Sequence, residues 1–229
     1  MYGYYYDPTY LLLIPGVILA FVAQILVSSA FSKWSRVRSS SGLTGAEIAR
    51  RILNANDCMD VKVAHIPGKL TDHFDPEQGT LRLSDEVYGS GSVAALAVAA
   101  HEAGHAIQNA QGYAPMRIRA RIVPAANIGS MAAGPLFFLG LIASWEPLMH
   151  IGIYLFALAV LFYVVTIPVE LDASGRALSI LQTGLPEEEM RGARAVLRAA
   201  ALTYVASALQ ALLQLLRLVA IANGRRRQD

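Results

Sequence analysis

The sequence predicts a mainly α-helical membrane protein whose transmembrane helices are joined to one small cytoplasmic α+β unit. Three observations lead to this prediction. The 229-residue chain is 55% hydrophobic with a mean hydropathy of +0.42, too apolar for an ordinary soluble domain of this length. Its charged residues leave several windows of membrane-spanning length uncharged. Between the first two such windows, the pattern changes to that of short helices and strands.

The first uncharged window lies between Asp7 and Lys33. About 20 apolar residues cross a hydrocarbon core of roughly 30 Å, so residues 1–32 are interpreted as an N-terminal transmembrane anchor. A cleavable signal peptide is the rival interpretation. We prefer the anchor because no basic segment precedes the apolar run and the run is too long for a signal peptide.

Two further windows, from Arg121 to Glu146 and from Glu146 to Glu170, share only the short loop SWEPLMH. They predict a transmembrane helical hairpin over residues 122–169. A cytoplasmic helical segment is expected to follow over residues 170–198.

The last apolar segment, residues 199–229, predicts a helix with a basic tail. Polar side chains recur every three or four residues, which places them on one helical face: Thr203, Ser207, Gln210, Gln214 and Arg217. The helix is either a fourth span packed against protein or a helix lying along the membrane surface.

The positions of arginine and lysine predict the orientation. All 19 lie in residues 33–121 or after residue 170, whereas the Tyr-rich N-terminus and the SWEPLMH loop have none. The positive-inside rule therefore places the N-terminus and that loop outside, and residues 33–121 and 170–198 in the cytoplasm. The tyrosines suit an interfacial belt. The tail GRRR at 224–227 would be misplaced outside, which argues against a crossing by the final helix.

Residues 33–121 are predicted to form an α+β unit. Thr44 and Glu47 have the spacing of a capping box that opens a helix, and Ser92 can cap a second helix that runs to about Gln111. VKVAHI alternates like a strand, and GKLTDHF, DPEQG and TLRLS predict a hairpin with Pro and Gly in its turn. TLRLS, residues 80–84, is expected to be an edge strand that could pair with an extended peptide.

The pentad HEAGH stands inside the second of these helices. His101 and His105 are four residues apart, so both imidazoles point to the same side and can bind one metal ion. Glu102 is placed to act as a general base without being a ligand, which is the zincin arrangement His-Glu-x-x-His. At this composition the pattern arises by chance in about 0.4% of such chains. Zn²⁺ suits imidazole and carboxylate ligands.

A catalytic zinc has three protein ligands, so one more is required. Six residues are candidates for this position: His65, Asp72, His73, His150, Glu170 and Asp172. We favour Glu170, because a carboxylate that ends 23 uncharged residues at the membrane edge needs a partner. Asp172 is the runner-up, although Arg176 four residues on can pair with it.

Composition also excludes some classes of function. A net charge of +2 is too small to indicate binding to nucleic acid. The single cysteine, Cys58, rules out an internal disulfide framework and is interpreted as a small core residue.

The motifs HEAGHAIQ and PVELDAS, together with YYYDPTYLLLIPG, TGAEIARRIL and GKLTDHFDP, resemble those of the YugP-like neutral zinc metallopeptidases of bacterial membranes. The resemblance covers nearly the whole chain. It implies that His101 and His105 are zinc ligands and that Glu102 is the base. The chain is also similar to the HtpX and CAAX-protease group, in which an aspartate four residues after the ligand glutamate accompanies the site. Ser174 stands at that position here, so another group is expected to support the ligand histidine.

The GKLTDHFDP segment has two interpretations. It is either a substrate-facing hairpin in which His73 or Asp72 polarises the scissile carbonyl, or a turn held by local side-chain hydrogen bonds.

The sequence thus predicts a gluzincin-like zinc endopeptidase, with Zn²⁺ bound by His101, His105 and Glu170. The expected partners are the lipid bilayer and membrane or membrane-proximal protein substrates. The expected location is the bacterial inner membrane, with the N-terminus outside and the site facing the cytoplasm. The alternative is a catalytically inactive metal-binding membrane scaffold.

Overall fold

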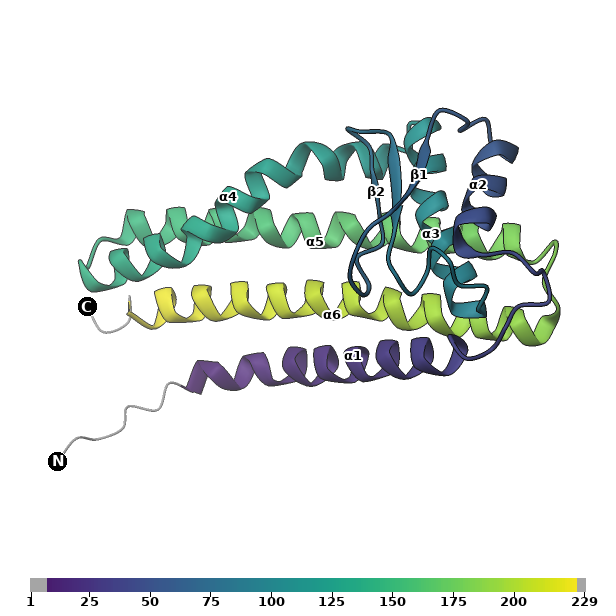
Figure 1. The fold of residues 1–229 in the computed structure, drawn as a ribbon. Coiled ribbons are helices and arrows are strands. Elements are labelled where there is room, and N and C mark those ends of the chain that lie inside the picture. The colour runs from purple at the N-terminus through teal and green to yellow at the C-terminus, as the bar shows by residue number, and fades with distance from the viewer. Residues whose placement is uncertain (1–7, 226–229) are drawn as a thin grey trace. The chain divides into compact units, whose positions relative to one another are not determined.

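A computed structural model describes residues 8–225, and in this range the protein is mainly helical (Figure 1). In chain order the elements are η1 (Pro8–Leu13), α1 (Ile14–Trp34), α2 (Gly45–Ala55), β1 (Lys62–His65), β2 (His73–Asp75), β3 (Thr80–Leu83), α3 (Val93–Ala110), α4 (Ala114–Ile142), α5 (Glu146–Leu181) and α6 (Glu187–Arg225). The N-terminal tyrosines at 2 and 4–6 and the end of the basic tail, on which the orientation argument drew, lie outside the described residues.

Within residues 8–225, four helices are long and apolar enough to cross a membrane: Pro8–Trp34, Ala114–Ile142, Glu146–Leu181 and Glu187–Gly224. The helix lengths thus agree with the membrane class predicted from composition. The last of them belongs to α6, which runs for 39 residues without a break.

The chain divides into two compact units. The first comprises Met1–Val22, Ile118–Ile167 and Thr203–Asp229, and the second comprises Ala23–Arg117 and Pro168–Leu202. The four long helices each contribute residues to both units.

In the first unit, parts of α4 and α5 form a closely packed helical hairpin (Figure 1). Three glycines permit the approach. A Cβ on Gly129 would lie 2.8 Å from the carbonyl oxygen of Leu155, and one on Gly140 would lie 2.6 Å from the backbone nitrogen of Met149. Gly152 meets the backbone of α4 in the same way. Small residues at helix contacts are typical of packing between membrane helices.

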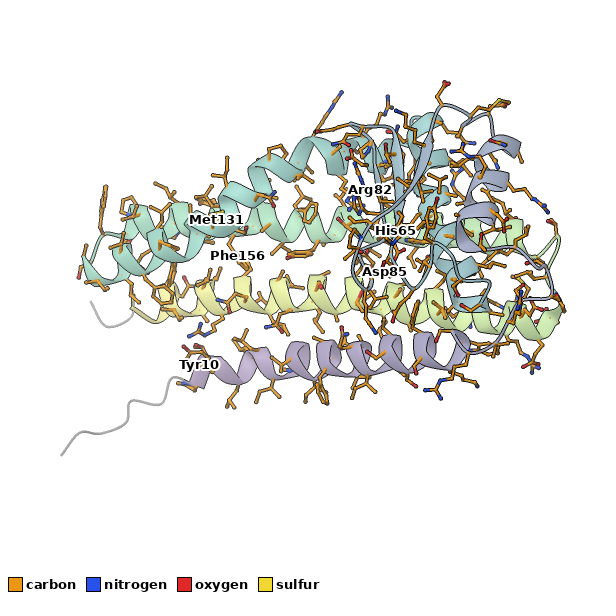
Figure 2. The ribbon with its side chains drawn as sticks, viewed as in Figure 1. Tyr10, His65, Arg82, Asp85, Met131 and Phe156 are labelled. Atoms are coloured by element: carbon orange, nitrogen blue, oxygen red, sulfur yellow. The ribbon has the colours of Figure 1, made fainter. Side chains whose placement is uncertain are left out.

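The polar stripe of α6 packs against the start of the chain in this unit. Arg217 is only 5% exposed. Its Nε donates to Thr9 Oγ1 at 3.1 Å, and its guanidinium lies 3.8 Å from the ring centroid of Tyr10, which Figure 2 labels. These contacts favour a helix packed against protein over one lying free on a membrane surface.

In the second unit, the strands form a three-stranded sheet in the order β1-β3-β2. The predicted hairpin is confirmed, since β2 and β3 pair in antiparallel fashion. The expectation that TLRLS is an edge strand is wrong: β1 pairs in parallel with the other side of β3. Because β3 is central, its backbone groups are already bonded on both sides, and the sheet edges are β1 and β2.

Helices α2 and α3 begin where their caps predict. The Thr44 hydroxyl accepts from the backbone N–H of Glu47 at 3.3 Å, and the Glu47 carboxylate accepts from the backbone N–H of Thr44 at 2.8 Å. Ser92 accepts from the N–H of Ala95 at the start of α3. Most of α3 is buried in the core of this unit, so the HEAGH segment sits on a well-supported helix.

We expect Thr44→Ala to lower the free energy of unfolding by about 1 kcal/mol, because it removes one of the two reciprocal capping bonds. Thr44→Ser keeps the hydroxyl and should match the parent chain. Chemical denaturation in detergent measures both variants. Equal stability of Thr44→Ala and Thr44→Ser would show that the capping box contributes nothing.

Candidate metal centre

Two helices of the second unit bring three side chains to one point. His101 and His105 come from α3 and Glu170 comes from α5. Glu170 Oε2 lies 3.3 Å from His101 Nε2 and 3.4 Å from His105 Nε2. The ligand atoms of all three residues lie within 4.8 Å of one another. The structure therefore brings together the three residues expected from the sequence.

The two separations from Glu170 Oε2 to the histidine nitrogens fit a zinc ion. A tetrahedral site with bonds of about 2.0–2.1 Å has neighbouring ligand atoms roughly 3.3–3.4 Å apart. The site is also shielded from water, because the side chains of His101, His105 and Glu170 are 13%, 11% and 3% exposed. The donor set of two imidazoles and one carboxylate suits a catalytic zinc, which leaves a fourth position for water or substrate.

The glycine of HEAGH explains how α5 reaches the histidines. A Cβ added to Gly104 would lie 2.8 Å from the carbonyl oxygen of Ala173, closer than real Cβ contacts allow. The missing side chain thus lets the backbone of α5 pass directly against α3, one turn from Glu170 along the chain. Small residues in this motif can leave room either for substrate or for another backbone. At Gly104 the structure supports the second use, because the backbone of α5 occupies the space.

The outer nitrogens of both histidines are hydrogen-bonded. His101 Nδ1 lies 3.1 Å from Ser174 Oγ, and His105 Nδ1 lies 3.0 Å from Gln108 Oε1. Ser174 therefore contacts the ligand histidine itself, although we expected some other group to do so. Sequence reasoning missed Gln108. The available signal was its spacing, since it follows His105 by three residues and so lies on the same helical face.

The surroundings of His105 favour positive charge. Burial by itself lowers its pKa, but the hydrogen bond to Glu170 and the negative charges of Glu102 and Glu170 outweigh burial and raise the pKa of His105 above its ordinary value. A site that attracts a proton in this way also attracts a metal cation. Glu102 is itself 9% exposed, next to His101 on α3. It is not one of the three residues whose ligand atoms converge.

The runner-up ligand, Asp172, has other partners. Its Oδ2 accepts from Arg176 Nε at 2.6 Å, which confirms the predicted pair, and from Gln108 Nε2 at 2.7 Å. Asp172 is not part of the converging group.

The remaining candidate ligands are engaged elsewhere. His65 Nε2 lies 2.6 Å from Asp85 Oδ1, a pair labelled in Figure 2. Hydrogen bonding from the backbone N–H of Gly68 and from His65 lowers the pKa of Asp85. His73 Nδ1 faces the carbonyl oxygen of Thr71. His150 stacks on Tyr154 within α5.

The GKLTDHFDP segment is held by local side-chain hydrogen bonds, the second of its two interpretations. The Asp72 carboxylate accepts from the backbone N–H and the hydroxyl of Ser84, at 2.7 and 2.9 Å. Asp75 accepts from two backbone N–H groups of the following turn and from Arg82 Nη1 at 2.9 Å. The Arg82 guanidinium and these N–H groups lower the pKa of Asp75. The structure offers no separate support for His73 in catalysis.

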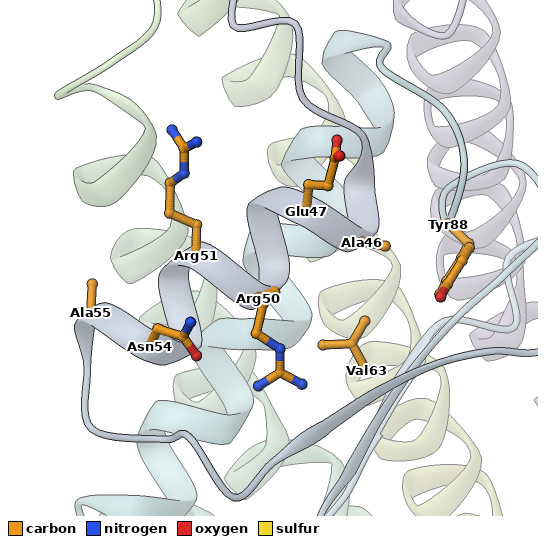
Figure 3. Close-up of a pocket in the computed structure, with 8 residues that line it drawn as sticks. All are labelled: Ala46, Glu47, Arg50, Arg51, Asn54, Ala55, Val63 and Tyr88. Carbon is orange, nitrogen blue, oxygen red and sulfur yellow. The ribbon is translucent and has the colours of Figure 1, made fainter.

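A cavity of about 760 Å³ opens between α2 and the region of β1 (Figure 3). None of the converging residues lines it, and the Arg50 guanidinium at its wall donates to the carbonyl oxygens of Met59 and Val61. The side chain of Arg50 therefore ties α2 to the segment before β1.

Comparison with known proteins identifies the family of the chain. The model of a family described as "Putative neutral zinc metallopeptidase" matches residues 9–223. The chain belongs to this family. It is also 47% identical over 210 residues to the "Putative membrane protease YugP" of Bacillus subtilis (strain 168), covering 90% of this chain and 93% of that protein. No solved structure matches the chain. The resemblance inferred from the motifs is therefore confirmed, and zinc is the metal that the family and the donor set both indicate.

The metal centre predicts different outcomes for two neighbouring carboxylates. Glu170→Ala removes a converging ligand and should abolish stoichiometric zinc binding. Asp172→Ala should keep one zinc per chain at saturating metal, because Asp172 lies outside the converging group. Elemental analysis of the two purified variants measures this. Retention of zinc by Glu170→Ala and its loss by Asp172→Ala would show that the third ligand is assigned wrongly.

Proposed function

We propose that the protein is a gluzincin-like zinc endopeptidase in which His101, His105 and Glu170 hold the metal. The observation that carries the proposal is the position of Glu170 Oε2, 3.3 and 3.4 Å from the Nε2 atoms of the two histidines of one HExxH motif. A third glutamate ligand from a later helix is the gluzincin arrangement. A bound zinc ion would polarise a peptide carbonyl and lower the pKa of water to roughly 7.

Glu102 is the proposed general base. Its carboxylate would accept a proton from the attacking water and deliver it to the nitrogen of the leaving amine, so that one group serves both halves of the hydrolysis. Two features support this role. Glu102 follows a ligand histidine directly in the chain, and it is buried without being one of the converging ligands. A scaffold that only binds metal would not need this carboxylate.

The proposed location of the site is the cytoplasmic side of a bacterial inner membrane. The argument rests on the basic residues: residues 33–121 and 170–198 contain 15 of the 19 arginines and lysines, while the SWEPLMH loop contains none. This orientation places the N-terminus outside. A zinc site built partly from a membrane-spanning helix favours membrane or membrane-proximal proteins as substrates.

Glu102→Gln separates the enzyme from the inactive scaffold. We expect this variant to keep its zinc but to hydrolyse a panel of membrane proteins about 10²- to 10⁴-fold more slowly, the usual contribution of a general base. Glu77→Gln, at an exposed turn position outside the site, is the matched control and should behave as the parent chain. Loss of zinc from Glu102→Gln would contradict the non-ligand role. Absence of hydrolysis by the parent chain would favour the scaffold.

The orientation is tested by cysteine labelling in cells. Cys58, which is buried, is first replaced by alanine. A cysteine introduced in SWEPLMH should then react with an impermeant thiol reagent added outside, and one introduced near Gly79 should not, because basic residues mark the retained side. The reverse pattern would place the site on the outer face.

A further inference from the structure

We propose that Gln108 is a positioning residue that holds His105 in the tautomer and orientation needed for zinc, and that Asp172 acts on the metal centre through Gln108. Gln108 contacts the ligand His105 but takes no direct part in the proposed reaction. Gln108 is fully buried, at 0% exposure, in the last turn of α3. A buried amide is retained at a cost unless all its groups are bonded.

The surroundings fix which way the amide of Gln108 points. Its Nε2 donates to the carbonyl oxygen of Val169 at 2.8 Å and to Asp172 Oδ2 at 2.7 Å. Both partners are acceptors that carry no proton here. A flipped amide would set its oxygen against two acceptor oxygens, which is repulsive. The amide oxygen of Gln108 must therefore face His105.

This orientation in turn fixes the tautomer of His105. An amide oxygen can only accept a hydrogen bond, so the Nδ1 atom of His105, 3.0 Å away, must carry the proton. The Nε2 atom then presents its lone pair to the point where Glu170 Oε2 lies, 3.4 Å off. Ligand histidines in metal sites are held by such outer hydrogen bonds, which orient the ring and raise its basicity.

The two histidines differ in this respect. His101 faces the hydroxyl of Ser174, which can both donate and accept and so imposes no tautomer by itself. Of these two partners, Gln108 donates a hydrogen bond to a carboxylate, that of Asp172. Asp172 polarises the amide of Gln108 and is itself held in place by Arg176. Asp172 thus reaches the site through Gln108 instead of touching a ligand histidine.

The inference rests on the zinc site of the proposed function, so its test measures zinc affinity and not peptidase activity. The dissociation constant for Zn²⁺ is determined by chelator competition for the full-length chain in detergent. We expect Gln108→Met, which keeps the size of the side chain but removes the acceptor, to weaken zinc binding about 10- to 100-fold. Gln182→Met, the same substitution at an exposed position in the turn after α5, is the matched control and should leave the affinity within twofold.

A double-mutant cycle tests the path from Asp172. Asp172→Asn should weaken zinc binding about threefold or more in the parent chain, and by less than twofold in the Gln108→Met background, because its route to the site has been removed. Equal effects of Asp172→Asn in both backgrounds would show that Asp172 does not act through Gln108. If Gln108→Met does not fold, Asp172→Asn alone still decides, since unchanged zinc affinity in that variant would overturn the proposal.

Two further measurements separate positioning from a structural role. With Co²⁺ in place of zinc, Gln108→Met should change the visible absorption spectrum, which reports the ligand geometry, whereas Gln182→Met should not. Thermal unfolding of the metal-free proteins measures the structural contribution of Gln108. A Gln108→Met variant that is less stable without metal but has unchanged zinc affinity and Co²⁺ spectrum would contradict the proposal. Gln108 would then only stabilise the packing of α3 against α5. Failure of the parent chain to bind zinc would instead refute the metal site itself.

Discussion

The close approach of α5 to α3 at Gly104 is the contact on which the metal centre depends. Any side chain at this position would meet the carbonyl of Ala173 at 2.8 Å or less, and α5 would have to move outward. Glu170 lies three residues before Ala173, so the same displacement would carry its carboxylate away from the histidines. The glycine inside the HEAGH pentad is therefore a requirement of helix packing as much as a part of the motif.

The close approach of α5 to α3 also buries the negative charge of Glu170. This burial is favourable only when a cation is present. The side chain of Glu170 is 3% exposed, and a carboxylate at that depth is costly unless positive charge lies nearby. His101 and His105 supply this charge only when protonated, whereas a zinc ion supplies it while both remain neutral. The hydrogen bonds on the outer nitrogens of the histidines come from a hydroxyl and an amide, which add no further charge to the site. Metal binding and burial of Glu170 thus support each other.

Local sequence patterns predicted the parts of the fold that local chemistry determines. The caps at Thr44 and Ser92, the hairpin and the membrane class all follow from residues a few positions apart, and Glu170 stood out as a charge that ends a long uncharged run. The central place of β3 could not be read in this way, because the parallel partner β1 lies across an intervening strand in sequence. Gln108 escaped because a neutral amide in a helix carries no pattern of its own. Only the positions of Val169 and Asp172, more than 60 residues later, give it a role.

The order of the ligands along the chain has a consequence for biogenesis. Both histidines belong to α3 and are synthesised early. With Glu170 as the third ligand, the site is complete only after α4 and most of α5 have been made. A ribosome-bound chain that ends before residue 170 carries the HExxH motif and no complete metal centre. The proposed metal site would thus remain incomplete until the α4–α5 hairpin had been made, whereas α6 follows later in the chain.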